Sequence, residues 1–250
     1  MPAGQLPNLI VIGAMKCGTS SLHYNLGLHP EITMSREKEL YFFNGGSSWD
    51  KGIDWYRSQF PAGTRWRGES CPSYTRAPAC EGVAERMHQV IPDTRLIYMV
   101  RHPVDRIVSH YVHRVAIGQE SRPIEEAVTD FPNREYVQRS RYFFQLSKFL
   151  RLYPASQIRV VTLESFKANP DRAMAEIFRF LDIDDGFTSP EFTTVRHKSS
   201  HKGKKNRVGL MLKWLSDTRP AKVFPTDVRM RMGRLLYAPF TKKMERPVLS

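Results

Sequence analysis

Residues 9–22 read LIVIGAMKCGTSSL. The run Leu9 to Ile12 is aliphatic and mostly β-branched, which predicts a buried strand. A glycine ends this run, Gly18 follows, and hydroxyl side chains from Thr19 onward predict a helix start. In such a unit the loop N–H groups and the helix N-terminus point at one spot, which favours an anion. Lys16 adds a positive charge inside the loop, so the stretch predicts an anion site, with an ordinary strand–turn–helix as the alternative.

The spacing of this loop differs from that of a nucleoside-triphosphate P-loop. A P-loop reads G-x-x-x-x-G-K-[ST], with the lysine after the second glycine and a hydroxyl that binds Mg²⁺. Here Lys16 precedes Gly18. The best later strand, 96–100, is followed by Arg101 and not by an aspartate that would hold the metal. The loop therefore predicts phosphate binding without an obligatory metal, and a P-loop nucleotide kinase or hydrolase stays as an alternative.

A second motif, RHPVDRIVSHY, occupies residues 101–111. Arg101 follows the predicted strand 96–100, and an arginine at the carboxyl end of a parallel strand points into the ligand crevice of an open α/β sheet. Ser109 lies two turns into the helix that follows, and His113 lies one turn further on the same face. The motif predicts a second anion contact, with a strand end paired to a surface carboxylate as the alternative.

A charged pair runs straight into aromatic residues at 38–44, KELYFFN. Two interpretations of Glu39 follow from this pattern. In the first, Phe42 and Phe43 fill the core while Glu39 stays in water. In the second, the carboxylate lies beside the anion loop, where it acts as a general base.

These motifs together resemble the sulfotransferases that use 3′-phosphoadenosine 5′-phosphosulfate (PAPS), in particular the heparan sulfate sulfotransferases and their bacterial relatives. The resemblance implies that the 5′-phosphosulfate is bound by a loop composed of Lys16, Cys17, Gly18, Thr19, Ser20 and Ser21. It implies that Arg101 and Ser109 bind the 3′-phosphate. It further implies that Glu39 is the catalytic base and that Lys16 stabilises the transferring group.

Three positions need separate comment within this resemblance. His113 falls where an N-sulfotransferase relative carries a functional histidine, and a structural helix histidine is the alternative. Tyr41 stands where relatives have histidine or glutamine, so its role stays open. Ser70 stands where relatives often have a lysine, which affects the prediction of the acceptor and not that of the donor.

Residues 196–207, RHKSSHKGKKNR, contain six Lys or Arg and no acid. A solvated basic loop and a nucleic-acid patch are two interpretations, but the aromatics that stack on single strands are missing. The third is the family's K-G-R loop, which closes over the donor. By that resemblance Lys202 is the second catalytic lysine, and Gly203 with Lys204 clamps the 3′-phosphate. The predicted helix 226–237 resembles the family's closing helix.

The whole chain of 250 residues is compatible with one domain, 1–250. Strand and helix patterns alternate, which predicts an α/β fold: a P-loop-type parallel sheet with helices on both faces. A long helix is expected over 136–153. Three cysteines are too few for a disulfide framework, and neither a signal pattern nor an apolar run of about 20 residues occurs, so a cytoplasmic location is expected.

The predicted function is sulfuryl transfer by in-line displacement from PAPS to a hydroxyl or amine of a glycan, glycolipid or small metabolite, with no metal required. The formal net charge of +13 favours anionic ligands by long-range attraction. We expect a nucleotide sulfate donor and an acidic or carbohydrate acceptor, and no nucleic acid. Peripheral membrane contact stays open as a role for the surplus charge. A basic polyanion-binding module without catalysis is the remaining alternative.

Overall fold

A computed structural model describes residues 4–129, 135–194, 203–205, 241–243 and 247. These residues belong to two compact units, 1–106 with 137–197 and 107–136 with 198–250. Each unit is described by itself. The extent of the predicted domain, 1–250, stays a prediction. The first unit contains the main sheet and most of the predicted site residues.

The first unit is built on a five-stranded sheet in the order β2-β3-β1-β4-β5. Every neighbouring pair is parallel, which confirms the predicted sheet type. The strand in the middle, β1, is buried along its whole length, as expected for a strand covered on both faces. The strands are β1 Leu9–Gly13, β2 Ile32–Met34, β3 Trp66–Ser70, β4 Arg95–Val100 and β5 Ile158–Thr162.

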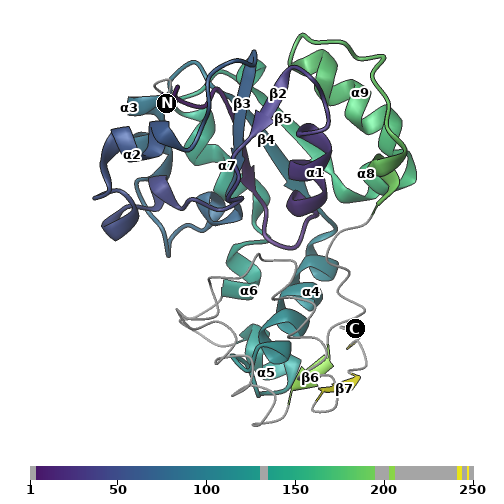
Figure 1. Ribbon diagram of the computed structural model, residues 1–250. Helices are drawn as coiled ribbons and strands as arrows, with labels where there is room; N and C mark the ends of the chain where they lie inside the picture. Colours follow the sequence, from purple (N-terminus) through teal and green to yellow (C-terminus); the bar gives the residue numbers. More distant parts are fainter. Residues whose placement is uncertain (1–3, 130–134, 195–202, 206–240, 244–246, 248–250) are drawn as a thin grey trace. The chain divides into compact units, whose positions relative to one another are not determined.

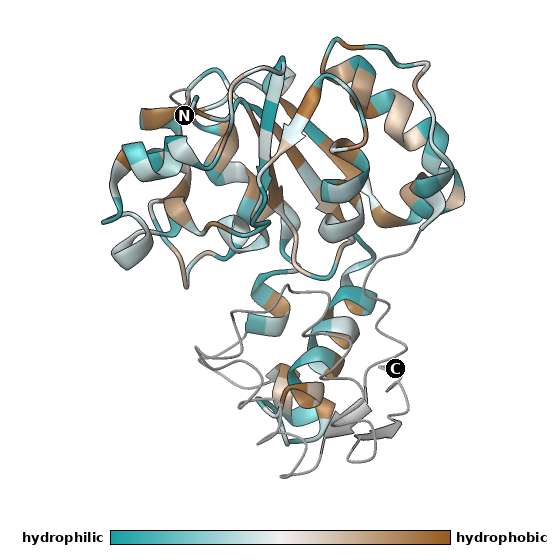
Figure 2. Cartoon of the chain, viewed as in Figure 1, coloured by the Kyte–Doolittle hydropathy of each residue, from teal (hydrophilic) through white to brown (hydrophobic). Residues whose placement is uncertain are grey.

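Helices cover both faces of this sheet, as predicted (Figure 1). One face carries α1 Thr19–Leu26, α8 Leu163–Ala168 and α9 Pro170–Phe180. The other face carries α3 Val83–Val90 and α7 Tyr142–Leu150, and α2 Gly52–Ser58 lies on the same side. The strands at the centre are largely hydrophobic, whereas the flanking helices carry both hydrophobic and hydrophilic residues (Figure 2).

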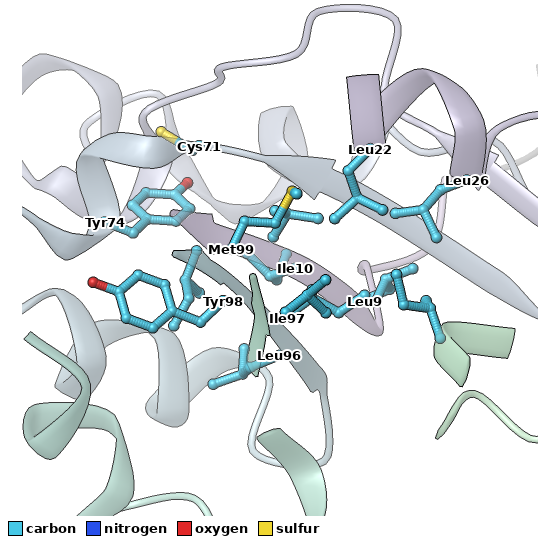
Figure 3. Close-up of a cluster of buried hydrophobic side chains, with 14 of the residues drawn as sticks. Leu9, Ile10, Leu22, Leu26, Cys71, Tyr74, Leu96, Ile97, Tyr98 and Met99 are labelled. Atoms are coloured by element: carbon cyan, nitrogen blue, oxygen red, sulfur yellow. The ribbon is translucent and has the colours of Figure 1, made fainter. Parts of the chain in front are cut away.

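The core lies between the sheet and these helices. Leu22 and Leu26 of α1 point toward the sheet, over the strand that carries Leu9 and Ile10 (Figure 3). All four side chains are fully buried. Their burial holds α1 against the sheet. The short loop that joins β1 to α1 therefore lies at the carboxyl end of the sheet.

Two parts of the first unit differ from the sequence-based expectation. Strand β3 carries the polar sequence WRGES, yet it is largely buried because β2 and β1 flank it. The expected helix 136–153 is divided into α6 Glu135–Gln138 and α7. The N–H groups of Ser140 and Arg141 bond to carbonyls three residues earlier, so the chain turns tightly there and the helix ends.

The second unit contains the later part of helix α4, Pro103–Ala116, and the short helix α5 Ile124–Thr129. Val108, Val112 and Ile124 form a small apolar cluster between them. Strands β6 Gly203–Lys205 and β7 Thr241–Lys243 pair antiparallel. Within the ranges the structure describes, no helix is both long and apolar enough to cross a membrane.

Candidate active site

The loop between β1 and α1 is a tight turn over residues 15–18. Lys16 and Gly18 both adopt left-handed backbone angles, with φ of 70° and 87°. Gly18 also lies close to a neighbour, since a Cβ there would stand 2.7 Å from Leu163 Cδ1. Alternation of right- and left-handed residues turns successive N–H groups toward one side and forms an anion-binding concavity. The loop therefore has the backbone shape that the motif predicts.

The first turn of α1 leaves its N–H groups available at this loop. Ser21 and Leu22 donate their N–H groups to the Gly18 carbonyl. Among the described residues, the N–H groups of Gly18, Thr19 and Ser20 find no acceptor. Free N–H groups at a helix N-terminus carry partial positive charge and bind anions. The structure thus supplies main-chain donors at the predicted phosphosulfate loop.

Cys17 contributes to this loop through its packing. Its side chain is fully buried, with Sγ 3.7 Å from the Tyr142 hydroxyl. Burial raises the pKa of the thiol to about 11, so the side chain stays neutral. Its N–H donates to the Ala14 carbonyl inside the turn. The buried side chain of Cys17 therefore helps to shape the loop, and its part in donor binding stays a prediction.

Glu39 is held by two hydrogen bonds, one on each carboxylate oxygen. Lys38 Nζ lies 2.6 Å from Oε1, and the Tyr41 hydroxyl donates to Oε2 at 2.6 Å. Burial acts to raise the pKa of Glu39, but the charge and hydrogen bond of Lys38 and the hydrogen bond of Tyr41 lower it. The charge of Lys16 lowers it further, so Glu39 is an ionised carboxylate within the field of the loop lysine.

Each interpretation of segment 38–44 is correct in part: the aromatic residues fill the core, but Glu39 is held by hydrogen bonds. Phe42 and Phe43 are buried in the core, where Phe42 stacks on Tyr56 at a centroid distance of 4.2 Å. Glu39 is only half-buried, but it is engaged and not free in water. The Lys38 carbonyl accepts the N–H of Ser70, which ties the segment to the carboxyl end of β3. Because β3 neighbours β1, Glu39 and the anion loop lie at the same edge of the sheet.

A histidine that the motifs did not single out joins this region. His23 of α1 lies with Nδ1 3.0 Å from the hydroxyl of Ser70, which is fully buried. Burial, followed by the charge of Lys38, lowers the pKa of His23 to about 4, so the ring is neutral. The sequence signal was the helical spacing of His23 one turn after Thr19. At the carboxyl end of β3 the chain therefore has a neutral hydrogen-bonded pair, His23 and Ser70.

Arg101 lies at the end of β4, as predicted. Its guanidinium Nη2 is 3.2 Å from Asp105 Oδ2, and its side chain is largely covered. The surface-carboxylate pairing that was the alternative is thus present, with Asp105 on the first turn of α4. This pairing holds the guanidinium at the carboxyl end of the sheet, where an anionic ligand would meet it.

Two further arginines add positive charge behind the loop. Arg106 is fully buried and donates through Nε to the Ser140 hydroxyl. Burial lowers the pKa of Arg106 to about 10, and the like charge of Arg139 contributes to the decrease. Arg139 approaches Met15 of the loop, with Nη1 2.7 Å from Sδ. The loop therefore has buried positive charge close to it, which favours an anion.

The remaining predicted residues belong to the second unit. Ser109 is buried in α4 and His113 is half-buried. Lys202 lies outside the described residues, as do most of the basic loop 196–207 and the predicted helix 226–237. Gly203 and Lys204 begin β6 and pair with Lys243 and Lys242. The roles assigned to these residues stay predictions.

The parallel sheet and the anion loop place the chain among α/β proteins with a P-loop-like fold, and comparison with known proteins identifies its family. The profile of the sulfotransferase domain family matches residues 6–222. The chain therefore belongs to the sulfotransferase family, which confirms the resemblance and disfavours the kinase and polyanion-binding alternatives.

Known relatives and a solved structure agree with this assignment. Bovine bifunctional heparan sulfate N-deacetylase/N-sulfotransferase 2 is 31% identical over 201 residues, covering 72% of this chain and 22% of the relative. Human heparan sulfate glucosamine 3-O-sulfotransferase 5 is 30% identical over 193 residues, covering 72% of this chain and 54% of the relative. A sulfotransferase from Alicyclobacillus acidocaldarius superposes with a TM-score of 0.66 at 25% identity, covering 90% of this chain and 99% of that one. The chain thus spans about a fifth to a half of the length of these two curated relatives.

Proposed function

We propose that this protein transfers a sulfuryl group from PAPS to a hydroxyl or amine of a glycan acceptor. One observation carries the proposal: an ionised carboxylate, Glu39, whose pKa is lowered by the charge of Lys16, lies at the same edge of the sheet as main-chain donors that suit an anion. Family membership supports PAPS as the donor. The names of the relatives, heparan sulfate N- and 3-O-sulfotransferases, support a glycan as the acceptor.

The donor binds along the carboxyl end of the sheet in this proposal. The N–H groups of Gly18, Thr19 and Ser20 receive the 5′-phosphosulfate, with the side chains of Lys16 and Ser21 around it. Arg101 receives the 3′-phosphate, and the parts of Ser109 and Lys204 in binding it stay predictions from the sequence. A phosphate at Arg101 competes with Asp105 for the guanidinium, and a phosphate dianion is the stronger partner for a fork of N–H donors.

The transfer itself requires positioning and charge stabilisation. The acceptor oxygen or nitrogen attacks sulfur in line, a new bond to sulfur forms, and the bond from sulfur to the donor phosphate oxygen breaks. Negative charge grows on the leaving phosphate, and Lys16 and Lys202 stabilise it. The proton of the acceptor passes to a base on the opposite side. The products are the sulfated acceptor and adenosine 3′,5′-bisphosphate.

Glu39 is the proposed base. Its lowered pKa keeps it ionised and ready to accept a proton across the neutral range. A carboxylate is a weak base, so proton transfer accompanies the bond changes at sulfur and does not precede them. His113 is the second candidate for this role, and the turnover of the Glu39→Gln variant distinguishes the two.

The reaction is proposed to need no metal, because lysines supply the positive charge that Mg²⁺ supplies in kinases. In the part of the chain that the structure describes, no group of three or more His, Cys, Asp or Glu side chains could hold a metal ion. Activity that survives EDTA treatment would agree with this proposal. Loss of activity that returns with Mg²⁺ would contradict it.

The cytoplasmic location stays a prediction from the sequence.

Thermal shift is the first test of the proposed function. Adenosine 3′,5′-bisphosphate should stabilise the protein in the presence of EDTA, since a ligand that binds only the folded state raises its melting temperature. MgATP or an oligonucleotide should not do so. Labelled PAPS with a panel of glycan hydroxyl and amine acceptors, read by mass spectrometry, then identifies the acceptor. Stabilisation by MgATP alone would overturn the proposal.

A further inference from the structure

Tyr41 has a backbone conformation that its residue type disfavours. Its φ is 57° and its ψ is 14°, in the left-handed region that a residue with a Cβ enters at a cost in free energy. Its two successors, Phe42 and Phe43, are fully buried, whereas Tyr41 is 42% exposed. The large aromatic ring is thus kept out of the core at a strained position. Such strain concentrates at functional sites.

The surroundings show what keeps the backbone in this conformation. Phe42 stacks on Tyr56, and the side-chain amide of Asn44 donates to the Ser73 hydroxyl at 2.7 Å. The N–H of Asn44 donates to the Tyr41 carbonyl at 3.1 Å and closes the turn. These contacts anchor the chain immediately after Tyr41, so its left-handed turn is imposed by packing.

The turn brings the Tyr41 hydroxyl to Glu39. The hydroxyl donates to Oε2 at 2.6 Å, while Lys38 Nζ occupies Oε1 at the same distance. Two donors on opposite oxygens fix both the position and the plane of the carboxylate. Burial and the hydrogen bond to Glu39 raise the pKa of Tyr41 above its ordinary value, so its hydroxyl remains a donor at neutral pH.

From this geometry we infer that Tyr41 is a positioning residue, which orients the carboxylate of Glu39 and keeps it ionised. The inference deepens the proposed function and rests on it for the catalytic meaning of Glu39. The contact itself does not depend on which reaction the protein catalyses. Tyr41 acts through Glu39, and no contact of its own with donor or acceptor is needed.

The groups around Glu39 determine in which direction its pKa changes when the Tyr41 hydroxyl is removed. Lys38 and Lys16 lower its pKa together with the Tyr41 hydroxyl, against the effect of burial. The charge of Glu39 is also felt by His23, Glu69 and Cys71, while Arg139 acts on Tyr41. A hydroxyl that donates to a carboxylate stabilises its ionised form. Removing this hydroxyl therefore raises the pKa of Glu39.

The test uses Tyr41→Phe, which keeps the ring and loses only the hydroxyl. NMR of protein labelled with ¹³C at the glutamate carboxyl carbon follows the titration of Glu39, whose signal is identified by its loss in Glu39→Gln. We expect Glu39 to titrate at higher pH in Tyr41→Phe than in the wild type. Because the pair is partly exposed, we expect kcat to fall roughly three- to tenfold, with the KM for PAPS unchanged.

Tyr153→Phe is the matched control. It removes a tyrosine hydroxyl that donates to the main-chain carbonyl of Ile91 and to no carboxylate. The titration of Glu39 should be unchanged in this variant. If Tyr41→Phe fails to fold, Tyr41→Asn takes its place, since asparagine tolerates the left-handed backbone and its short side chain lacks the tyrosine hydroxyl.

The outcomes separate the inference from the proposed function. The same titration of Glu39 in the wild type and Tyr41→Phe would overturn the inference. A titration that moves to higher pH, with kcat unchanged, would uphold the contact and contradict Glu39 as the base in the proposed function. A shifted titration with a lower kcat supports both.

Discussion

The anion loop, residues 15–18 with the first turn of α1, and the segment 38–44 lie at one edge of the sheet but present different parts of the chain. In the loop the main chain presents the functional groups, and side chains such as Cys17 are buried to hold its shape. In the segment the side chains present them, and Lys38 and Tyr41 each donate a hydrogen bond to the carboxylate of Glu39. The loop should therefore be sensitive to changes of backbone shape, and the segment to changes of single atoms.

The largest expected effect is that of Glu39→Gln, which replaces one oxygen and keeps the size of the side chain. We expect turnover to fall by about 10²–10⁴, the usual span for loss of a general base, with nucleotide affinity little changed. The measurement is kcat on a hydroxyl acceptor, because an amine that is already deprotonated needs less help. Glu37→Gln, which changes an exposed neighbour, is the control. Near-normal turnover in Glu39→Gln would transfer the role to His113, and His113→Ala would be the next variant.

Arg101→Ala should have the next largest effect, and on binding. A charge-assisted contact of ~1.5–3 kcal/mol predicts a roughly ten- to hundredfold weaker binding of adenosine 3′,5′-bisphosphate. Adenosine 5′-phosphate lacks the 3′-phosphate and should lose much less. Calorimetry with the two nucleotides measures the difference directly. Equal losses for both would contradict the assignment of Arg101 to the 3′-phosphate.

Gly18→Ala tests whether the loop depends on its backbone shape. A Cβ at Gly18 combines a left-handed φ with a 2.7 Å approach to Leu163 Cδ1, which should cost about 1–3 kcal/mol of unfolding free energy. Gly46→Ala is a matched control, since Gly46 also has a left-handed φ but nothing lies within 4 Å of the added Cβ. Urea unfolding compares the two. Nucleotide affinity should fall in Gly18→Ala only. An equal loss of affinity in both variants would contradict a dependence of nucleotide binding on the backbone shape at Gly18.

The smallest expected effect on activity concerns His23. This residue lies on α1, which follows the anion loop, and the charge of Lys38 in segment 38–44 lowers its pKa. Its folded pKa of about 4 lies below the ordinary value of 6.5, so the unfolded chain binds a proton more tightly. This contribution to stability is complete above about pH 6.5 and is lost as the pH falls toward 4. We expect His23→Gln to lose about 2 kcal/mol less unfolding free energy than the wild type between pH 7 and 4.5 in urea unfolding. Identical pH dependence would mean that His23 is not held neutral.

The elements that sequence reasoning predicted best are those whose apolar residues follow the pattern of a buried strand or of an amphipathic helix. Strand β1 and residues 96–99 of β4 are buried because helices cover both faces of the sheet, and their sequences are almost entirely apolar. Helix α9 repeats its apolar residues at helical spacing. Strand β3 escaped prediction because Glu69 and Ser70 are polar, although both are fully buried. The break at 139–141 escaped too, because hydrogen bonds to carbonyls three residues back leave no mark in the hydrophobic pattern.

For the site, the sequence by itself determined the loop and the arginine that follows β4. Glycine spacing dictates local backbone shape, and a residue that follows a parallel strand must lie at its carboxyl edge. Only the tertiary structure decided that Lys38 and Tyr41 hold Glu39 from two sides and that His23 meets Ser70 across 47 residues of sequence. Burial sets the pKa of His23 and the direction of the Tyr41 side chain, and burial depends on which strands become neighbours. No local pattern carries that information, because it arises from the packing of segments that are distant in the chain.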